Sequence, residues 1–293
     1  MWHVRHSALF ALPAVLSRLP PQQRYTLALD TLLSLSTDHC AAVRSGVLEV
    51  LGEVLYTFHQ DEGGPPAQLV ALFLGRKKDR CLPDGQHLSS PLSAGGTSHD
   101  AMLESFYNDP GRPLVCAFNF PAVALTLGRD RWCELRDVYL DIASDKTFKV
   151  QRTLAASLGE LAKIIGEENA QRDLVGVWWD AVRCEEEDVR VKAVECVDDF
   201  VLALGSDAGA NIIQRLVEMW DDGTLRGWKE REAIAKALMS FARSSSGQQC
   251  PSLVEALLAR ALGDRVAAVR EIAVTLVSLF CHSVKLLKIL LAF

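Results

Sequence analysis

The chain has 293 residues, and its 31 basic and 37 acidic side chains give a formal net charge of −6. This acidic balance argues against nucleic acid as the partner and favours a protein ligand. The length exceeds a typical single-domain core, yet no change in composition divides the chain into two globular halves. An array of repeats accounts for this, because each repeat packs only on its neighbours.

A short motif, aspartate followed after four residues by valine and arginine, recurs along the chain. It is complete at residues 38–44 and 264–270. Aligned on the residue before the arginine, its copies start at Val4, Val43, Gly111, Val150, Val189, Glu230 and Val269. The steps between these copies are 39, 68, 39, 39, 41 and 39 residues, so the period is close to forty.

Six copies place apolar side chains four, five and eight residues after their start, which is one face of a helix. The Gly111 copy is irregular, with Asn119 at the third of these places, and the Glu230 copy has lost its valine. A period near forty with paired amphipathic helices is typical of HEAT and armadillo repeats. The sequence therefore predicts an all-α, HEAT/armadillo-type α-solenoid of about seven helix-pair repeats, the first and last incomplete.

The N-terminal apolar run, residues 8–16, has some likeness to a signal peptide. Its repeat phase and Pro13 favour the second helix of a truncated repeat instead. The longest run without charge, residues 113–128, has sixteen residues. A membrane helix needs about 20, so no membrane span is expected.

One repeat step is 68 residues long, so about 29 extra residues lie between two of the B helices. They fall within residues 76–112, which are rich in proline, glycine and serine and poor in large apolar side chains. We expect a flexible insertion loop there. It separates N-terminal HEAT repeats, residues 1–75, from C-terminal HEAT repeats, residues 113–293, which continue the same solenoid.

In the C-terminal part, an A helix is expected before each motif and a B helix from the motif onward. Apolar spacing predicts A helices at residues 131–143, 172–182, 210–220 and 252–262. Short A–B turns follow them at residues 144–149, 185–188, 221–227 and 263–267. Longer breaks between repeats are expected at residues 205–207 and 244–251.

The arginine of the motif stands in the first turns of a B helix, where the positive end of the helix dipole disfavours it. The aspartate of the motif can cap N–H groups of helix B and accept a bidentate bond from the arginine of an adjacent repeat. We predict a structural ladder that contains Asp38, Arg44, Asp145, Arg152, Arg190, Arg231, Asp264 and Arg270. Gln151 holds the arginine's place before Arg152, so that rung is altered. Exposed pairs contribute about 1 kcal/mol or less each, so the ladder would mainly fix the register between repeats.

No catalytic constellation stands out in the sequence. Patterns for a serine nucleophile, a phosphate-binding loop, a dinucleotide site or a zinc protease are absent. The eight cysteines lie singly, which is typical of a reducing, intracellular compartment, and Cys81, His87 and His99 match no zinc module. We therefore expect no enzyme activity, no metal and no cofactor, and a cytoplasmic or nuclear location or both.

The A–B turns of a HEAT stack lie along one ridge, and three consecutive turns here carry charged and aromatic side chains. We predict that a partner binds at Lys146, Phe148, Lys149, Glu186, Glu187, Arg226 and Trp228. Trp228 is the stronger anchor because no helical face claims it, although packing beneath the turn is the alternative. The acidic run at residues 185–188 is equally typical of a solvated helix start.

Trp178 and Trp179 are neighbours on a predicted A helix. Side chains of successive helical residues point about 100° apart. One tryptophan should therefore lie in the core, and the other between repeats or exposed.

A family resemblance lies in the middle of the chain. Residues 116–121, Cys-Ala-Phe-Asn-Phe-Pro, are followed by 124–128, Ala-Leu-Thr-Leu-Gly, and by Trp132, Glu134, Leu135 and Arg136. This pattern resembles the protein phosphatase 4 regulatory subunit 1 family, and residues 149–162 look like the same family. The resemblance covers roughly residues 40–280 and is most specific over 114–166.

Family members are longer, are built of HEAT repeats and are similar in architecture to the scaffold subunit of protein phosphatase 2A. The resemblance implies a non-catalytic regulatory or scaffold subunit. Such a subunit binds the catalytic subunit of a protein Ser/Thr phosphatase and directs its choice of phosphoprotein substrates. The resemblance identifies no individual residue that contacts the catalytic subunit, so the predicted partner-binding residues rest on turn geometry.

The chain departs from the family at both ends. It begins in a B helix and ends in residues 284–291 without a polar cap, so we expect a fragment of a longer protein. An importin-like or assembly adaptor has the same architecture and is the alternative function. Such adaptors usually carry longer acidic inner surfaces than residues 185–188.

Overall fold

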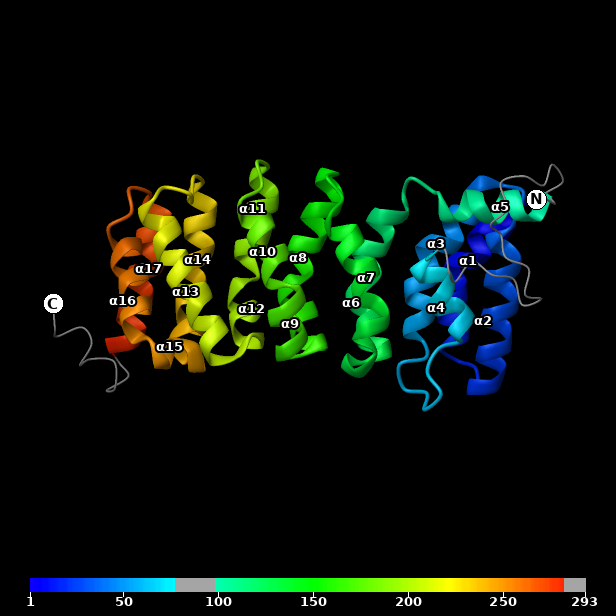
Figure 1. Ribbon diagram of the computed structural model, residues 1–293, viewed down its shortest axis with the longest axis horizontal. Helices are drawn as coiled ribbons and strands as arrows, with labels where there is room; N and C mark the ends of the chain where they lie inside the picture. Colours follow the sequence, from blue (N-terminus) through cyan, green and yellow to red (C-terminus); the bar gives the residue numbers. More distant parts are fainter. Residues whose placement is uncertain (77–97, 282–293) are drawn as a thin grey trace. The chain divides into compact units, whose positions relative to one another are not determined.

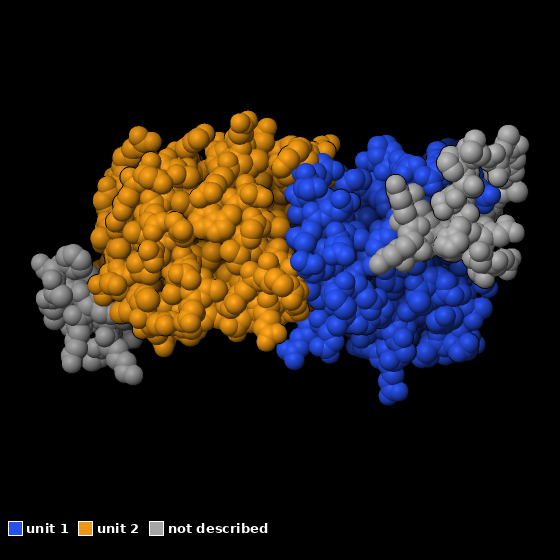
Figure 2. Space-filling model, viewed as in Figure 1, with its two compact units in different colours: residues 1–145 blue, residues 146–293 orange. Residues whose placement is uncertain are grey.

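The computed structural model describes residues 1–76 and 98–281, and all regular elements in these residues are helical (Figure 1). The chain forms two compact units, unit 1 from Met1 to Asp145 and unit 2 from Lys146 to Phe293 (Figure 2). Within each unit the helices alternate as A and B helices, and successive B helices pack on one another. This is the predicted all-α, HEAT-type architecture. The division into residues 1–75, 76–112 and 113–293 stays a prediction.

Unit 1 contains a row of three B helices among its described residues. They are α1 (Trp2–Leu16), α3 (Ala41–Tyr56) and α6 (Arg112–Leu127), and α3 packs on both of the others. The A helices are α2 (Pro21–Ser36), α4 (Ala67–Leu74) and α7 (Trp132–Ala143), and the 3-10 helix η2 (Arg129–Arg131) leads into α7. The N-terminal apolar run is therefore part of a B helix, as its repeat phase predicts.

The expected loop at residues 76–112 differs from the structure in its second part. The helix α5 (Ser98–Tyr107) forms there and packs on α2 and α3. It buries Leu103, Phe106 and Tyr107, which supply the apolar face that the proline and glycine content obscured. The first part of the loop, residues 77–97, lies outside the described residues.

Unit 2 contains four B helices and three A helices in its described residues, and three of these seven helices are interrupted once. The B helices are α8 (Phe148–Ile165), α11 (Glu187–Glu195) continued by α12 (Val197–Ala203), α14 (Trp228–Arg243) and α17 (Ala267–Cys281). The A helices are α9 (Glu167–Asp173) continued by α10 (Val175–Val182), α13 (Gly205–Asp221), and α15 (Ser245–Gln249) continued by α16 (Pro251–Leu262). α8 packs on α11, α11 on α14, and α14 on α17.

Two expectations about unit 2 need correction at its helix starts. The break expected at residues 205–207 is the first turn of α13, because Gly205 adopts a left-handed φ of 76° that reverses the chain without a loop. Trp228, expected in a turn, is the first residue of α14. The A–B turn therefore ends at Gly227, one residue before Trp228.

Two further expectations missed short helices. The A helix expected at residues 172–182 already begins at Glu167 and is interrupted at Leu174. The break expected at residues 244–251 contains the single helical turn α15. Both segments are polar, so an apolar period does not reveal them.

The predicted apolar face forms the core of the central repeats. In α3, Val47, Leu48 and Leu51 are at most 2% exposed. The equivalent side chains of α8, α11, α12 and α14 are also buried: Leu154, Ala155, Leu158, Ala193, Val194, Val197, Ile234, Ala235 and Leu238. In α1 and α17 the pattern is weaker, with Ala8 exposed and Val274 54% exposed, because each packs on one B helix among the described residues.

Asn119, the polar residue of the irregular Gly111 copy, is buried as well. Its Nδ2 atom donates to the carbonyl oxygen of Val115 at 3.0 Å, so its amide is satisfied within α6. Gly52 of α3 makes room for it, since a Cβ there would lie 2.4 Å from the Asn119 side chain. The described helices include none that is long and apolar enough to cross a membrane.

Candidate functional site

The arginine of the repeated motif ties the A–B turn to the B helix in several repeats. In four repeats its Nη1 atom donates to the carbonyl oxygen six residues earlier, in the A–B turn. The distances are 2.7 Å for Arg44 to Asp38, 2.8 Å for Arg190 to Cys184, 3.1 Å for Arg231 to Leu225 and 2.7 Å for Arg270 to Asp264. Carbonyls at a helix C-terminus lack intrahelical partners and carry partial negative charge. The attraction of the arginine to these carbonyl oxygens therefore offsets its repulsion by the positive end of the helix B dipole.

The aspartate of the motif closes the A–B turn. Asp38 Oδ1 accepts the N–H of Cys40 at 2.8 Å, and Asp264 Oδ1 accepts the N–H of Val266 at the same distance. Both N–H groups lie before the first residue of the B helix. The expected cap on helix B is therefore wrong, because the short side chain reaches only the N–H two residues ahead.

The same two carboxylates also bind the arginine of the preceding repeat. Arg5 donates from Nε to Asp38 Oδ2 at 2.6 Å and from Nη2 to Oδ1 at 2.9 Å. Arg231 donates in the same way to Asp264, at 2.6 and 3.5 Å. The ion pair and hydrogen bond with Arg5 hold the pKa of Asp38 below its ordinary value. Burial by itself would raise the pKa of Asp264, but the bonds from Arg231 and Val266 outweigh it and lower that pKa.

A third rung joins Arg190 to Glu230, which stands where five of the other six copies of the motif have valine. The Nε to Oε1 distance is 2.8 Å, and the two side chains are 9% and 1% exposed. The Arg231–Asp264 pair is 8% and 4% exposed. The expectation of partly solvated rungs is therefore wrong in unit 2, because stacked B helices cover both pairs. Sequence reasoning missed Glu230 and Arg5; the signals were the lost valine and the arginine after Val4.

The other arginines of the predicted ladder, Arg44, Arg152 and Arg270, form no ion pair with a carboxylate among the described residues. Gln151 takes the arginine's place and accepts a contact of 3.5 Å from the Cys184 thiol of the next repeat. Arg152 is exposed and makes no side-chain bond within the described residues, so it does not belong to the ladder. Asp145 is half-buried and lies in unit 1, just before the unit boundary. Arg44 donates to Ser105 of α5.

The predicted partner-binding residues all lie in unit 2, at or just before the N-termini of successive B helices. Lys146, Phe148 and Lys149 border the start of α8, Glu186 and Glu187 the start of α11, and Arg226 and Trp228 the start of α14. All seven are exposed, including Phe148 at 37% and Trp228 at 43%. The rungs link these N-termini from repeat to repeat, so the seven side chains share one edge, which we call the B-start edge.

The B-start edge is cross-linked between its last two turns. Lys229 Nζ lies 3.7 Å from Glu187 Oε1, and both side chains are about half exposed. Below this pair, a hollow of about 270 Å³ opens between α11, α12 and α14, lined in part by Trp228, Glu195 and Asp198. An exposed indole beside a charged hollow suits a protein partner with its own charged side chains.

The tryptophan pair behaves as the helical geometry predicts. Trp178 is fully buried, and its Nε1 atom donates to the carbonyl oxygen of Ala193 at 2.9 Å. Trp179 is half-buried between two guanidinium groups, with Arg183 at 4.9 Å and Arg215 at 5.8 Å from its ring centre. The cations fix this indole against the A helices, so it is not a free anchor.

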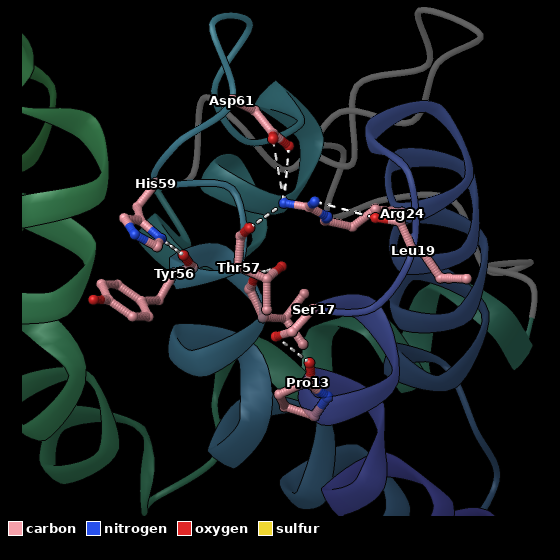
Figure 3. Close-up of polar contacts among 9 residues, drawn as sticks. Pro13, Ser17, Leu19, Arg24, Tyr56, Thr57, His59 and Asp61 are labelled. Carbon is pink, nitrogen blue, oxygen red and sulfur yellow. Dashed lines mark hydrogen bonds and ion pairs between the residues drawn. The ribbon is translucent and has the colours of Figure 1, made fainter.

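Unit 1 has a hollow of its own, about 480 Å³, near the ends of α1 and α3, and Figure 3 shows several of the residues that line it. Arg24 of α2 projects toward it and donates to the carbonyl oxygens of Thr57 and Leu19. Its Nη1 atom also lies 3.1 Å from Asp61 Oδ2. The arginine charge is thus neutralised inside the protein and is not offered to a ligand.

Part of the wall of this hollow is aromatic. Tyr56 and His59 stack with ring centres 4.4 Å apart and planes 2° apart, and Tyr56 is 41% exposed (Figure 3). His59 Nδ1 lies 2.8 Å from the Tyr56 carbonyl oxygen, which fixes the ring. Neither residue belongs to the repeated motif, so the motif does not predict this hollow.

The described residues offer no activated nucleophile among the buried thiols. Burial raises the pKa of Cys116 and of Cys196 to about 11, which keeps both thiols protonated and unreactive at neutral pH. Within residues 1–76 and 98–281, no cluster of three or more histidine, cysteine or acidic side chains is arranged to hold a metal ion. Cys81, His87 and the His99 side chain lie outside the described residues.

Known proteins share the middle of this chain. Residues 116–219 match the family model described as protein phosphatase 4 regulatory subunit 1 middle domain. A stretch of 163 residues is 33% identical to serine/threonine-protein phosphatase 4 regulatory subunit 1 of Homo sapiens and of Mus musculus. It covers 56% of this chain and only 17% of each relative.

The matched region contains part of the B-start edge. Lys146, Phe148, Lys149, Glu186 and Glu187 lie within residues 116–219, and Arg226 and Trp228 lie beyond them. The match also includes the Gln151–Cys184 rung and the buried Trp178. Over residues 116–219, the chain is similar to the protein phosphatase 4 regulatory subunit 1 family.

Proposed function

We propose that this protein is a non-catalytic HEAT-repeat regulatory or scaffold subunit of a protein Ser/Thr phosphatase of the phosphatase 4 type. It binds the catalytic subunit and directs the choice of phosphoprotein substrates. The observation that carries the proposal is the match of residues 116–219 to a domain of a phosphatase regulatory subunit. The relatives bear this role in their names, and the chain aligns with 17% of their length.

The structure supports a binding role through the B-start edge. A stack of helices whose polar ladder lies along one edge presents a long surface that suits protein binding. On that edge Trp228 and Phe148 are exposed beside lysine, arginine and glutamate side chains. Aromatic and arginine side chains are the usual energetic anchors of protein interfaces. We assign the catalytic-subunit contact to this edge.

The test is direct binding between purified proteins. The full chain is immobilised, and the phosphatase 4 catalytic subunit is passed over it, with a small GTPase as the comparison ligand for an importin-like adaptor. We expect saturable binding of the catalytic subunit and none of the GTPase. A folded chain that captures the GTPase, or that ignores the catalytic subunit, refutes the proposal.

Substrate direction is tested separately with the bound complex. Dephosphorylation rates of a panel of phosphoproteins are compared with and without the chain. A regulatory subunit should change the ratio of rates between substrates, while uniform scaling of all rates would argue against substrate choice. We also propose a cytoplasmic or nuclear location or both, which fractionation of cells into cytoplasm and nucleus tests.

A further inference from the structure

The helix α5 lies across the edge of unit 1 where α3 begins (Figure 1). Its apolar side is held by burial of Leu103, Phe106 and Tyr107. The Arg112 guanidinium covers the last two rings at 5.4 and 5.3 Å from their centres. Its polar side faces α3, where Arg44 of the ladder donates to Ser105 of α5. Ser45 of α3 donates to Asp109, just after α5, at 2.6 Å.

The arginine beneath α5 lacks the partner that other rungs have. Arg5, Arg190 and Arg231 each reach a carboxylate in a neighbouring repeat. Arg44 is only 8% exposed, and within residues 1–76 and 98–281 it forms no ion pair. Its Nη2 atom instead donates to the Ser105 hydroxyl oxygen at 2.9 Å. A buried guanidinium therefore faces a neutral group where the repeat pattern places an anion.

Ser105 is at the same time accessible. Its residue is exposed, and it lies third from the end of a ten-residue helix. A short helix at the surface opens locally at little cost, which allows a modifying enzyme to engage it. An exposed hydroxyl within hydrogen-bond distance of a buried, unneutralised arginine is the arrangement that a phosphate group would complete.

We propose that Ser105 is a phosphorylation site, and that its phosphate forms the missing rung with Arg44 and fastens α5 to the edge of unit 1. A protein kinase supplies the group from ATP. The bond between Ser105 Oγ and the γ-phosphorus forms as the bond from that phosphorus to the β–γ bridging oxygen breaks. ADP leaves, and a base of the kinase takes the hydroxyl proton.

Two charges oppose the added phosphate. The C-terminal end of α5 carries partial negative charge, and Glu104 is exposed beside Ser105. Both effects act through solvent and are screened, whereas Arg44 is buried and its guanidinium fork matches a phosphate. Asp109 is already held by Ser45 and by the N–H of Gly111. The contact between the phosphate and Arg44 therefore outweighs the repulsion, and phosphorylation should hold α5 more firmly on α3.

The inference is independent of the proposed function and is tested on the full chain. Phosphoserine is placed at position 105 by genetic encoding, and amide hydrogen exchange is measured across α5. We expect exchange in residues 98–107 to slow about tenfold relative to the unmodified protein. Phosphoserine at Ser34 is the matched control, because it is also exposed and third from the end of its helix, α2.

The arginine is tested by an Arg44→Gln variant, which keeps a donor and removes the charge. In this background phosphoserine at 105 should no longer slow exchange, and exchange elsewhere in unit 1 shows that the variant is folded. Equal protection with and without Arg44, or faster exchange in the modified protein, overturns the contact. Protein purified from its own cells should carry phosphate at Ser105 by mass spectrometry, and its complete absence under phosphatase inhibition overturns the modification.

Discussion

Arg190 and Glu230 form an ion pair between two consecutive repeats, with 2.8 Å between Nε and Oε1 and almost no exposure of either side chain. Glu230 occupies the place that valine holds in five of the other six copies of the motif. Removing one partner of a buried pair strands a charge in a medium that solvates it poorly. The pair therefore constrains which mutations the stack tolerates.

Arg190→Ala should lower the free energy of unfolding by about 3–5 kcal/mol, because it leaves Glu230 buried and unpaired. This is larger than the value of about 1 kcal/mol expected for a solvated rung. Urea denaturation followed by circular dichroism measures it. Lys192→Ala is the control, since Lys192 pairs with Glu195 at the surface and its loss should cost about 1 kcal/mol or less.

Replacing both partners tests the same idea in the opposite direction. Arg190→Met with Glu230→Val restores the usual valine and removes both charges. The double variant should be more stable than either single variant, because no unpaired charge stays buried. A double variant as unstable as the sum of the two singles would show that the ion pair is not the cause.

Asp264 should make stability depend on pH. Its folded-state pKa lies below the ordinary 3.8, so the carboxylate stabilises the folded chain above that pH and the contribution is lost as pH falls below it. Asp264→Asn should therefore destabilise strongly at neutral pH and progressively less towards about pH 3. Urea denaturation at several pH values measures the difference. Glu255→Gln is the control, because this carboxylate forms no ion pair within the described residues. The free energy of unfolding of this variant should change with pH as that of the wild type does.

Gly159 should tolerate no side chain. A Cβ on this residue of α8 would lie 2.9 Å from the Cys196 carbonyl oxygen and from Asp199 Cβ, so Gly159→Ala forces α8 and α12 apart. We expect a loss of about 1–3 kcal/mol in thermal or urea denaturation. Gly176→Ala is the matched control, because Gly176 also lies in a helix but has nothing within 4 Å of a Cβ. That change should stabilise by about 0.5–1 kcal/mol, and equal effects at both positions would contradict the close approach.

The B-start edge should lose its partner when its anchors are removed. Trp228→Ala with Arg226→Ala should weaken binding of the phosphatase catalytic subunit by about 2 kcal/mol if these are hot spots, close to thirtyfold in Kd. Both side chains are exposed, so the fold should survive. Leu202→Ala with Arg243→Ala, also exposed but at the opposite ends of the B helices, should leave Kd unchanged. Undiminished capture by the Trp228 and Arg226 variant would move the contact away from this edge.

The helices could be predicted from the sequence because apolar residues that recur at the helical period lie on one face, and that face is the buried one. A residue eight positions after the motif start, such as Leu51 or Leu158, returns to the same face and is buried. The same reasoning failed for α5, where ten residues, fewer than three turns of helix, are too few to show a period. Its burial depends on α2 and α3, which the local sequence does not reveal.

The polar contacts were harder to predict than the apolar ones. A period shows which face is buried, but not which charges meet on it. The partner of Arg190 lies forty residues away, and Glu230 reads in sequence as a lost valine. Only stacking of α11 on α14 brings the two together. The same holds for the carbonyl bonds of the motif arginines, since the turn conformation sets them.

The rung at Gln151 and Cys184 has a mechanical consequence for unit 2. Buried ion pairs tie α11 to α14 and the α14 repeat to the turn before α17, whereas α8 and the next repeat meet at this edge through a thiol, a weak donor. Further along α8, Gly159 lies in close contact with the start of α12. Under load, α8 and the next repeat should therefore separate first at the Gln151 side. The strength of the polar link at this edge thus differs from one pair of repeats to the next.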